Sequence, residues 1–106
     1  MLDYLDPEKQ YISHRLFREN CVLTQQGVYV KDLRIFANRS LKDSVIIDNA
    51  AYSFAFQVEN GIPIVPFYND KSDNELRAMV PYLKSLAKAS DVREFNKHYL
   101  KLEKYQ

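Results

Sequence analysis

The chain has 106 residues, of which 46% are hydrophobic and 27% charged, and its formal net charge is +1 at pH 7. This length and composition predict one folded domain with a packed core. The near balance of 15 basic and 14 acidic residues argues against a general nucleic-acid binder, which normally carries a clear basic excess. The single cysteine excludes an internal disulfide framework and a zinc site built from cysteines. No apolar run could span a bilayer and none follows Met1, so we expect an intracellular chain without a secretory signal.

The amino-terminal part of the sequence predicts short elements joined by turns. Asp6, with the Pro-Glu pair after it, is typical of a helix start in which Asp6 is the capping residue. Residues 12–17 predict a short strand. Residues 21–30 predict a β-hairpin with Gly27 at the position that needs a positive φ.

Two further strands are predicted in the middle of the chain. Residues 45–47 are β-branched without polar alternation, which is typical of a strand buried on both faces of a parallel sheet. Residues 62–65 predict another strand. Strands that alternate with helices indicate an α/β fold with a parallel sheet.

The carboxyl-terminal third carries the clearest helical pattern. Ser72 and Glu75 form a capping box, and the apolar residues that follow at spacings of three and four predict a helix that Pro81 kinks. A second helix is expected after Asp91. Its apolar face would be formed by Val92, Phe95, Tyr99 and Leu102.

Asp48 is a candidate site residue because it directly follows the strand at 45–47. In α/β sheets chemistry collects at the carboxyl ends of the strands, and a carboxylate buried there is costly unless it is paired or holds a metal. Asp48 and Asn49 offer oxygen ligands of the kind that Mg²⁺ takes. The alternative interpretation is that Asp48 caps the following helix and Asn49 lies in a turn.

Basic residues supply the other candidates. Lys31, at the end of the predicted hairpin, could neutralise a carboxylate and a phosphate together, or it could be an ordinary solvated lysine. Arg15 and Arg18 could hold a phosphoryl group bidentately, although such arginines are more often ion-paired at the surface.

Several segments carry a family resemblance. Residues 5–21, which include Leu-Phe-Arg-Glu, resemble the small carboxyl-terminal-domain phosphatases, the NLI-interacting-factor-like branch of the haloacid dehalogenase superfamily. The likeness continues in order through 29–33, 45–49, 60–64 and 70–76. It implies an α/β fold of haloacid dehalogenase-like (Rossmann-like) type: a three-layer parallel sheet with an inserted β-hairpin and two carboxyl-terminal helices.

The resemblance also implies an activity and roles for individual residues. The family consists of Mg²⁺-dependent phosphatases that act on serine or threonine phosphate through an aspartyl-phosphate. Lys31 matches the third-motif lysine, a catalytic and substrate-binding residue, and Arg18 matches an arginine near the substrate phosphate. Asp48 and Asn49 match the fourth motif, which completes the Mg²⁺ site and includes a catalytic aspartate. The expected partner is a phosphoprotein with a phosphoserine-containing tail, in the nucleus, with no direct contact to nucleic acid or membrane.

The sequence departs from the family pattern in two places. It contains no Asp-x-Asp-x-Thr nucleophile motif, since Asp3 and Asp6 are separated by two residues, and Ala50-Ala51 stands where Ser-Pro is usual. We therefore expect residues 1–106 to be the carboxyl-terminal part of one phosphatase domain, inactive alone. We also expect it to self-associate or to need a complementing amino-terminal segment. Two alternatives are a non-catalytic phosphopeptide- or protein-binding module, and the mitochondrial translocase-receptor branch of the family.

Overall fold

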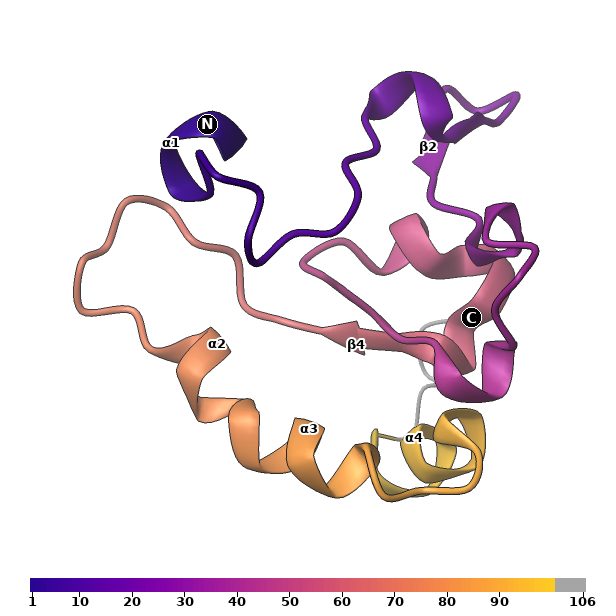
Figure 1. The fold of residues 1–106 in the computed structure, drawn as a ribbon. Coiled ribbons are helices and arrows are strands. Elements are labelled where there is room, and N and C mark those ends of the chain that lie inside the picture. The colour runs from indigo at the N-terminus through magenta and orange to yellow at the C-terminus, as the bar shows by residue number, and fades with distance from the viewer. Residues whose placement is uncertain (101–106) are drawn as a thin grey trace.

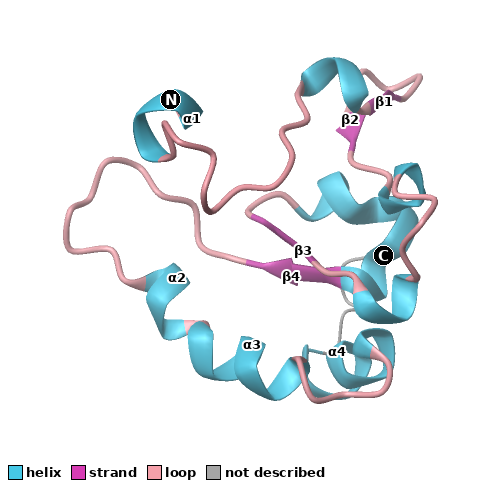
Figure 2. Ribbon diagram, viewed as in Figure 1, coloured by secondary structure: helices cyan, strands magenta, loops and turns pink. Residues whose placement is uncertain are grey.

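The computed structural model describes residues 1–100, in which short strands form two separate two-stranded sheets (Figures 1 and 2). The strands are β1 (Val22–Leu23), β2 (Tyr29–Val30), β3 (Ile46–Asp48) and β4 (Gly61–Pro63). The α-helices are α1 (Leu2–Leu5), α2 (Glu75–Ala78), α3 (Val80–Leu86) and α4 (Val92–Leu100). The 3₁₀ segments are η1 (Arg18–Asn20), η2 (Leu33–Ile35), η3 (Leu41–Asp43) and η4 (Ala51–Asn60). The chain is therefore a mixed α/β protein, and none of these helices is long and apolar enough to cross a membrane.

β1 and β2 form the predicted antiparallel hairpin. Gly27 in its turn has a φ of 81°, which glycine adopts without a steric penalty. Thr24 closes the turn, because its Oγ1 accepts a hydrogen bond from the Val28 N–H at 3.2 Å and its carbonyl accepts one from the Gly27 N–H at 3.0 Å. The hairpin delivers the chain to Lys31, which directly follows β2.

β3 and β4 form the predicted parallel pair. β3 begins one residue later than predicted, and β4 begins one residue earlier. Ile46 lies opposite Gly61, and Ile47 lies opposite Ile62. Within residues 1–100, β3 pairs with β4 alone, so Ile46 and Ile47 are half-buried and Val45 before them is exposed. The expected burial of this strand on both faces is therefore wrong for this chain.

The core lies between the parallel sheet and the carboxyl-terminal helices. Ile62 of β4, Leu86 of α3 and Val92 of α4 are buried together. Partly buried apolar side chains surround them: Ile47, Met79, Tyr82, Leu83, Phe95 and Leu100. In Figure 1, α2 and α3 (orange) run along one side of β4 and lead into α4 (yellow). The helices thus anchor the sheet whose strand ends carry Asp48.

The predicted carboxyl-terminal helices are present, with a break where Pro81 stands. Pro81 lies in the first turn of α3, after α2 has ended, because a proline removes one helical hydrogen bond and is tolerated only near a helix start. Val92 and Phe95 of α4 face the core as expected, whereas Tyr99 is largely exposed. Leu102, expected on the same face, lies outside the described residues.

Two local predictions are wrong. Asp6 does not begin a helix: it follows α1, and its carboxylate accepts hydrogen bonds from the N–H groups of Gln10 at 2.8 Å, Tyr11 at 3.1 Å and Ile12 at 2.9 Å. Residues 12–17 form neither a strand nor a helix. A carboxylate can satisfy several N–H groups of a tight loop as well as those of a helix start, and here the loop prevails.

The capping box before α2 is also wrong, although the helix begins close to the expected place. The Ser72 hydroxyl and N–H both donate to Asp70 Oδ1, at 2.7 and 2.9 Å. The N–H of Glu75 is satisfied by Asp73 Oδ1 at 2.9 Å. Two successive aspartate turns therefore replace the single serine cap.

Candidate functional site

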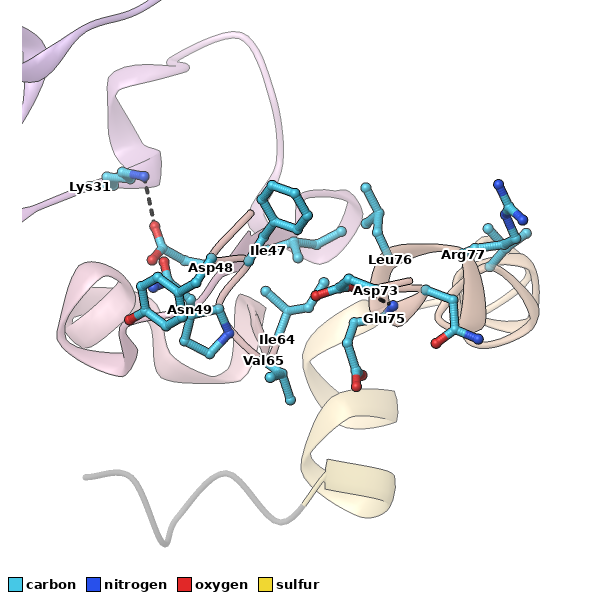
Figure 3. A pocket seen from close by; sticks show the side chains of 15 residues that line it. Lys31, Ile47, Asp48, Asn49, Ile64, Val65, Asp73, Glu75, Leu76 and Arg77 are labelled. Carbon is cyan, nitrogen blue, oxygen red and sulfur yellow. Dashed lines mark hydrogen bonds and ion pairs between the residues drawn. The ribbon is translucent and has the colours of Figure 1, made fainter. Parts of the chain in front are cut away.

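Lys31 and Asp48 form an ion pair between the end of β2 and the end of β3. Lys31 Nζ donates to Asp48 Oδ2 at 2.6 Å (Figure 3). The side chain of Asp48 is 7% exposed and that of Lys31 is 53% exposed. An ammonium that is half in solvent therefore neutralises a carboxylate that would be costly to bury alone.

The second oxygen of Asp48 is also engaged. Asp48 Oδ1 accepts a hydrogen bond from the Ala50 N–H at 2.9 Å. Ala50 is itself the N-cap residue of η4, so Asp48 closes a turn before that segment, and the interpretation of Asp48 as the helix cap is wrong. Burial raises the pKa of Asp48, but the hydrogen bonds from Lys31 and Ala50 outweigh burial and lower the pKa below its ordinary value of 3.8. Asp48 is therefore ionised at neutral pH.

Asn49 has an exposed side chain and lines, with Asp48, an open cavity of about 820 Å³. The cavity lies between the strand ends and α2, and Figure 3 shows Arg77 of α2 at the opposite end from Lys31. Other lining residues are Ile47, Ile64, Val65, Asp73, Glu75 and Leu76. One ammonium, one ionised carboxylate and one carboxamide thus meet at the rim of a cavity that a small anion could enter.

The donors at this rim fit a Mg²⁺ ion in part. Asp48 and Asn49 supply a carboxylate and an amide oxygen, the hard ligands that Mg²⁺ takes alongside waters and phosphate oxygens. Each Asp48 oxygen keeps a lone pair beyond its one hydrogen bond. Within the described range 1–100, no three His, Cys, Asp and Glu side chains converge on one point. These residues could therefore form one side of such a site, which water, phosphate or further carboxylates would complete.

Arg18 lies apart from Asp48, on a second open cavity of about 1130 Å³. Its guanidinium stacks over the Tyr29 ring, 5.5 Å from the ring centroid. Lys31 lines both cavities, so it links the Arg18 side of the site to the Asp48 side. The structure thus brings Lys31, Asp48 and Asn49 together, and Arg18 lies on a neighbouring cavity that shares Lys31 and Ile47 with theirs.

Arg15 is directed elsewhere. Its guanidinium donates to Asp3 Oδ1 at 2.6 Å and to the Asp6 carbonyl at 2.9 Å. The ion-paired interpretation therefore describes Arg15, which holds the amino-terminal segment together.

The sequence interpretation missed two buried polar residues of η4, Ser53 and Gln57. The Ser53 carbonyl accepts a hydrogen bond from the Lys31 N–H at 2.7 Å, and Gln57 contacts Asp32 and Leu33 directly after Lys31. The available signal was weak: Gln57 is a lone polar residue within the apolar stretch 54–58.

One family model and three relatives place the chain among known proteins. A family model described as NLI interacting factor-like phosphatase matches residues 1–93. CTD small phosphatase-like protein 3 of Caenorhabditis elegans is 45% identical over 103 residues, which cover 96% of this chain and 35% of that protein. Carboxy-terminal domain RNA polymerase II polypeptide A small phosphatase 2 of Homo sapiens is 42% identical over 78 residues, covering 74% and 28%. Mitochondrial import inner membrane translocase subunit TIM50 of Candida glabrata is 40% identical over 97 residues, covering 90% and 19%.

These matches cover 74–96% of the chain but only 19–35% of the length of the curated relatives. The family model covers the hairpin, both parallel strands, the Lys31–Asp48 pair and the helices up to the start of α4. The chain therefore belongs to the NLI-interacting-factor-like phosphatase family, as its motifs predict.

Proposed function

We propose that Lys31, Asp48 and Asn49 form one part of a Mg²⁺-dependent phosphatase site that acts on phosphoserine or phosphothreonine in proteins. The observation that carries the proposal is the 2.6 Å contact between Lys31 Nζ and Asp48 Oδ2 at a cavity that Asn49 also lines. An ammonium beside hard oxygen donors suits a phosphoryl group bound together with a divalent cation. Membership of a phosphatase family supports the same reaction class.

Lys31 would neutralise part of the negative charge of the phosphoryl group. Its ammonium has three N–H donors, of which Asp48 takes one, and its side chain borders both cavities. Asp48, itself fixed by the Ala50 N–H, keeps the ammonium in place while the phosphoryl oxygens approach. When bound at Asp48 and Asn49, Mg²⁺ would withdraw charge from those oxygens.

The nucleophile would come from outside these residues. A covalent phosphatase route needs a positioned carboxylate that attacks phosphorus. Asp48 is assigned to Lys31 and to the Mg²⁺ side of the site, and the sequence contains no Asp-x-Asp-x-Thr motif. The 106-residue chain alone is therefore proposed to be inactive.

A complementing strand has an obvious place on the sheet. We propose that residues 1–106 form the carboxyl-terminal part of one haloacid dehalogenase-like domain with a three-layer parallel sheet. The second edge of β3 has no partner strand within residues 1–100, and Val45 and Tyr52 near it are 36% and 57% exposed. A parallel strand added there from an amino-terminal segment would end beside Asp48, while a second copy of the chain would cover the same edge without a nucleophile.

One relative supports a proposal for the substrate and the location. The human relative is named for the carboxy-terminal domain of RNA polymerase II. We propose by analogy a phosphoserine-containing protein tail as substrate and the nucleus as location.

A second candidate function is non-catalytic binding of phosphopeptides. Arg18 and Lys31 line the same cavity, whose other walls include the apolar side chains of Leu16, Phe36 and Val45. Two cationic groups over an apolar surface suit a phosphorylated peptide without any turnover.

Hydrolysis of an aryl phosphate and binding of a phosphoserine peptide separate the two functions. With the purified chain, Mg²⁺, an EDTA control and the Asp48→Asn variant, the phosphatase proposal predicts no turnover. It also predicts peptide binding that weakens in EDTA and in Asp48→Asn. If the chain is a non-catalytic binding module, EDTA should leave binding of the phosphoserine peptide unchanged, and Arg18→Ala should abolish it. Turnover that needs Mg²⁺ and Asp48 would contradict the proposed need for an outside nucleophile.

A further inference from the structure

The segment η4 supplies the contacts that fix the backbone on both sides of the Lys31 side chain. The Lys31 N–H donates to the Ser53 carbonyl at 2.7 Å. The Leu33 N–H donates to Gln57 Oε1 at 3.0 Å, and Gln57 Nε2 donates to Asp32 Oδ1 at 2.8 Å. The side-chain carboxamide of Gln57 therefore contacts both residues that follow Lys31. Gln57 comes after β3 in the sequence, whereas Lys31 comes before it.

The backbone of η4 departs from helical geometry at Gln57. Its φ of −136° and ψ of 66° break the regular geometry of η4, and the residue is only 8% exposed. The neighbouring Phe56 is 46% exposed, so the polar side chain points inward while the apolar one points out. This inverts the usual preference and is tolerated because both ends of the buried carboxamide have partners.

Lys31 needs such support because its own side chain is weakly held. It is 53% exposed, and a lysine has many rotamers to lose when it is fixed. Val30 before it is buried at 3% exposure and anchors one side. The other side, the turn through Asp32 and Leu33, is anchored by Gln57.

We propose that Gln57 is a positioning residue, whose carboxamide orients the segment after Lys31 so that Lys31 Nζ reaches Asp48. Its importance for catalysis rests on the proposed function. The positioning itself is measurable without turnover, so its failure and the failure of the phosphatase proposal are seen in different assays.

The test uses the full 106-residue chain with Gln57→Leu, which keeps the side-chain volume and removes both hydrogen bonds, and with the exposed Gln26→Leu as a matched control. In each background the unfolding equilibrium constant is measured with and without Lys31→Met. In the parent and the control, Lys31→Met should shift that constant on the order of tenfold, because it leaves the buried carboxylate of Asp48 unpaired. In Gln57→Leu the shift should fall to about twofold.

Amide hydrogen exchange provides the second readout. Gln57→Leu should lower the protection of the Lys31 amide as well as that of Leu33, beyond any global change recorded at the core residue Ile62. Equal Lys31→Met shifts in both backgrounds, or loss of protection at Leu33 alone, would overturn the proposal and leave Gln57 a merely structural residue. Gln57→Asn, shorter by one methylene, is expected to act in the same direction and serves if Gln57→Leu does not fold.

A charge-preserving swap tests the contact itself. Gln57→Glu alone places a second carboxylate beside that of Asp32. It should reduce the Lys31→Met shift of the unfolding equilibrium constant, as Gln57→Leu does. Adding Asp32→Asn supplies a donor to the new carboxylate but removes the acceptor of the Arg34 N–H, so it should restore the Lys31→Met shift only in part. A Gln57→Glu chain that keeps the full Lys31→Met shift would overturn the proposal.

Discussion

The ring of Phe54 lies against the backbone of Gly61, so closely that a methyl group at position 61 would overlap the ring carbons. Phe54 comes from η4 and is fully buried, while Gly61 opens β4 opposite Ile46 of β3. The absence of a side chain at 61 is thus what lets η4 pack against the first residue pair of the parallel sheet.

Gly61→Ala is expected to destabilise the chain by about 1–3 kcal/mol, because the buried ring has no free space to move into. The free energy of unfolding from urea titration measures this effect. Phe54→Leu together with Gly61→Ala should cost less than the sum of the two single changes, since the smaller side chain relieves the overlap. If the losses of unfolding free energy in the two single variants add up to the loss in the double variant, the ring of Phe54 is not the obstacle.

A part-buried hydrogen-bond chain joins α3 and α4 to the end of η4. The Tyr82 hydroxyl donates to Asn96 Oδ1 at 2.6 Å, and Asn96 Nδ2 donates to the Glu59 carbonyl at 2.9 Å. Asn96 is fully buried, so Asn96→Ala leaves both partners unsatisfied and should cost about 3 kcal/mol, against about 1 kcal/mol for Tyr82→Phe. Tyr99→Phe, at an exposed ring, is the control and should change stability by less than about 0.5 kcal/mol. Equal losses in all three variants would contradict the account.

The stability of the chain should fall in acid. The pKa values of five carboxyl groups lie below the ordinary 3.8: Asp6, Asp32, Asp48, Asp70 and Asp91. Groups with a depressed folded pKa stabilise the fold above the unfolded pKa, and this contribution is lost as the pH falls through the folded values. The free energy of unfolding should therefore stay level from about pH 7 to about pH 5 and decline below about pH 4. Asp48→Asn should make the decline shallower, and a stability that holds or rises in acid would contradict the assignment.

Asp6 should control the order of the loop that follows it. Its carboxylate accepts the N–H groups of Gln10, Tyr11 and Ile12, so Asp6→Ala should speed exchange of these three amides by about tenfold or more. Glu8→Ala removes an exposed carboxylate of the same loop and should leave them protected. Unchanged exchange in Asp6→Ala would show that other contacts order the loop.

Much of the fold was predictable where local chemistry alone decides it. The hairpin follows from Gly27 in its turn, and the break between α2 and α3 follows from Pro81. Asp6 and Ser72 misled the prediction because an oxygen acceptor or hydroxyl suits several local geometries. The choice among them depends on neighbours such as Asp70 and on how the loop packs.

The site was predictable only in part. The positions of Lys31 and Asp48 after β-strands predicted functional side chains, but sequence spacing cannot bring two residues from different sheets to 2.6 Å. Gln57 escaped notice because its partners, Asp32 and Leu33, are 25 and 24 residues away and no motif marks it. Long-range contacts of buried polar groups are settled by the packed fold, and local patterns do not encode them.

Complementation is the most direct test of the account. An amino-terminal segment of a family member, chosen because it carries an Asp-x-Asp-x-Thr motif, would be added to the chain, and Mg²⁺-dependent hydrolysis of an aryl phosphate would be measured. The account predicts no turnover from either piece alone, turnover from the mixture, and loss of about 100-fold or more when the chain carries Lys31→Met. Turnover by the 106-residue chain alone, or equal turnover with Lys31→Met, would contradict the claim that Lys31 and Asp48 form one part of a site completed from outside.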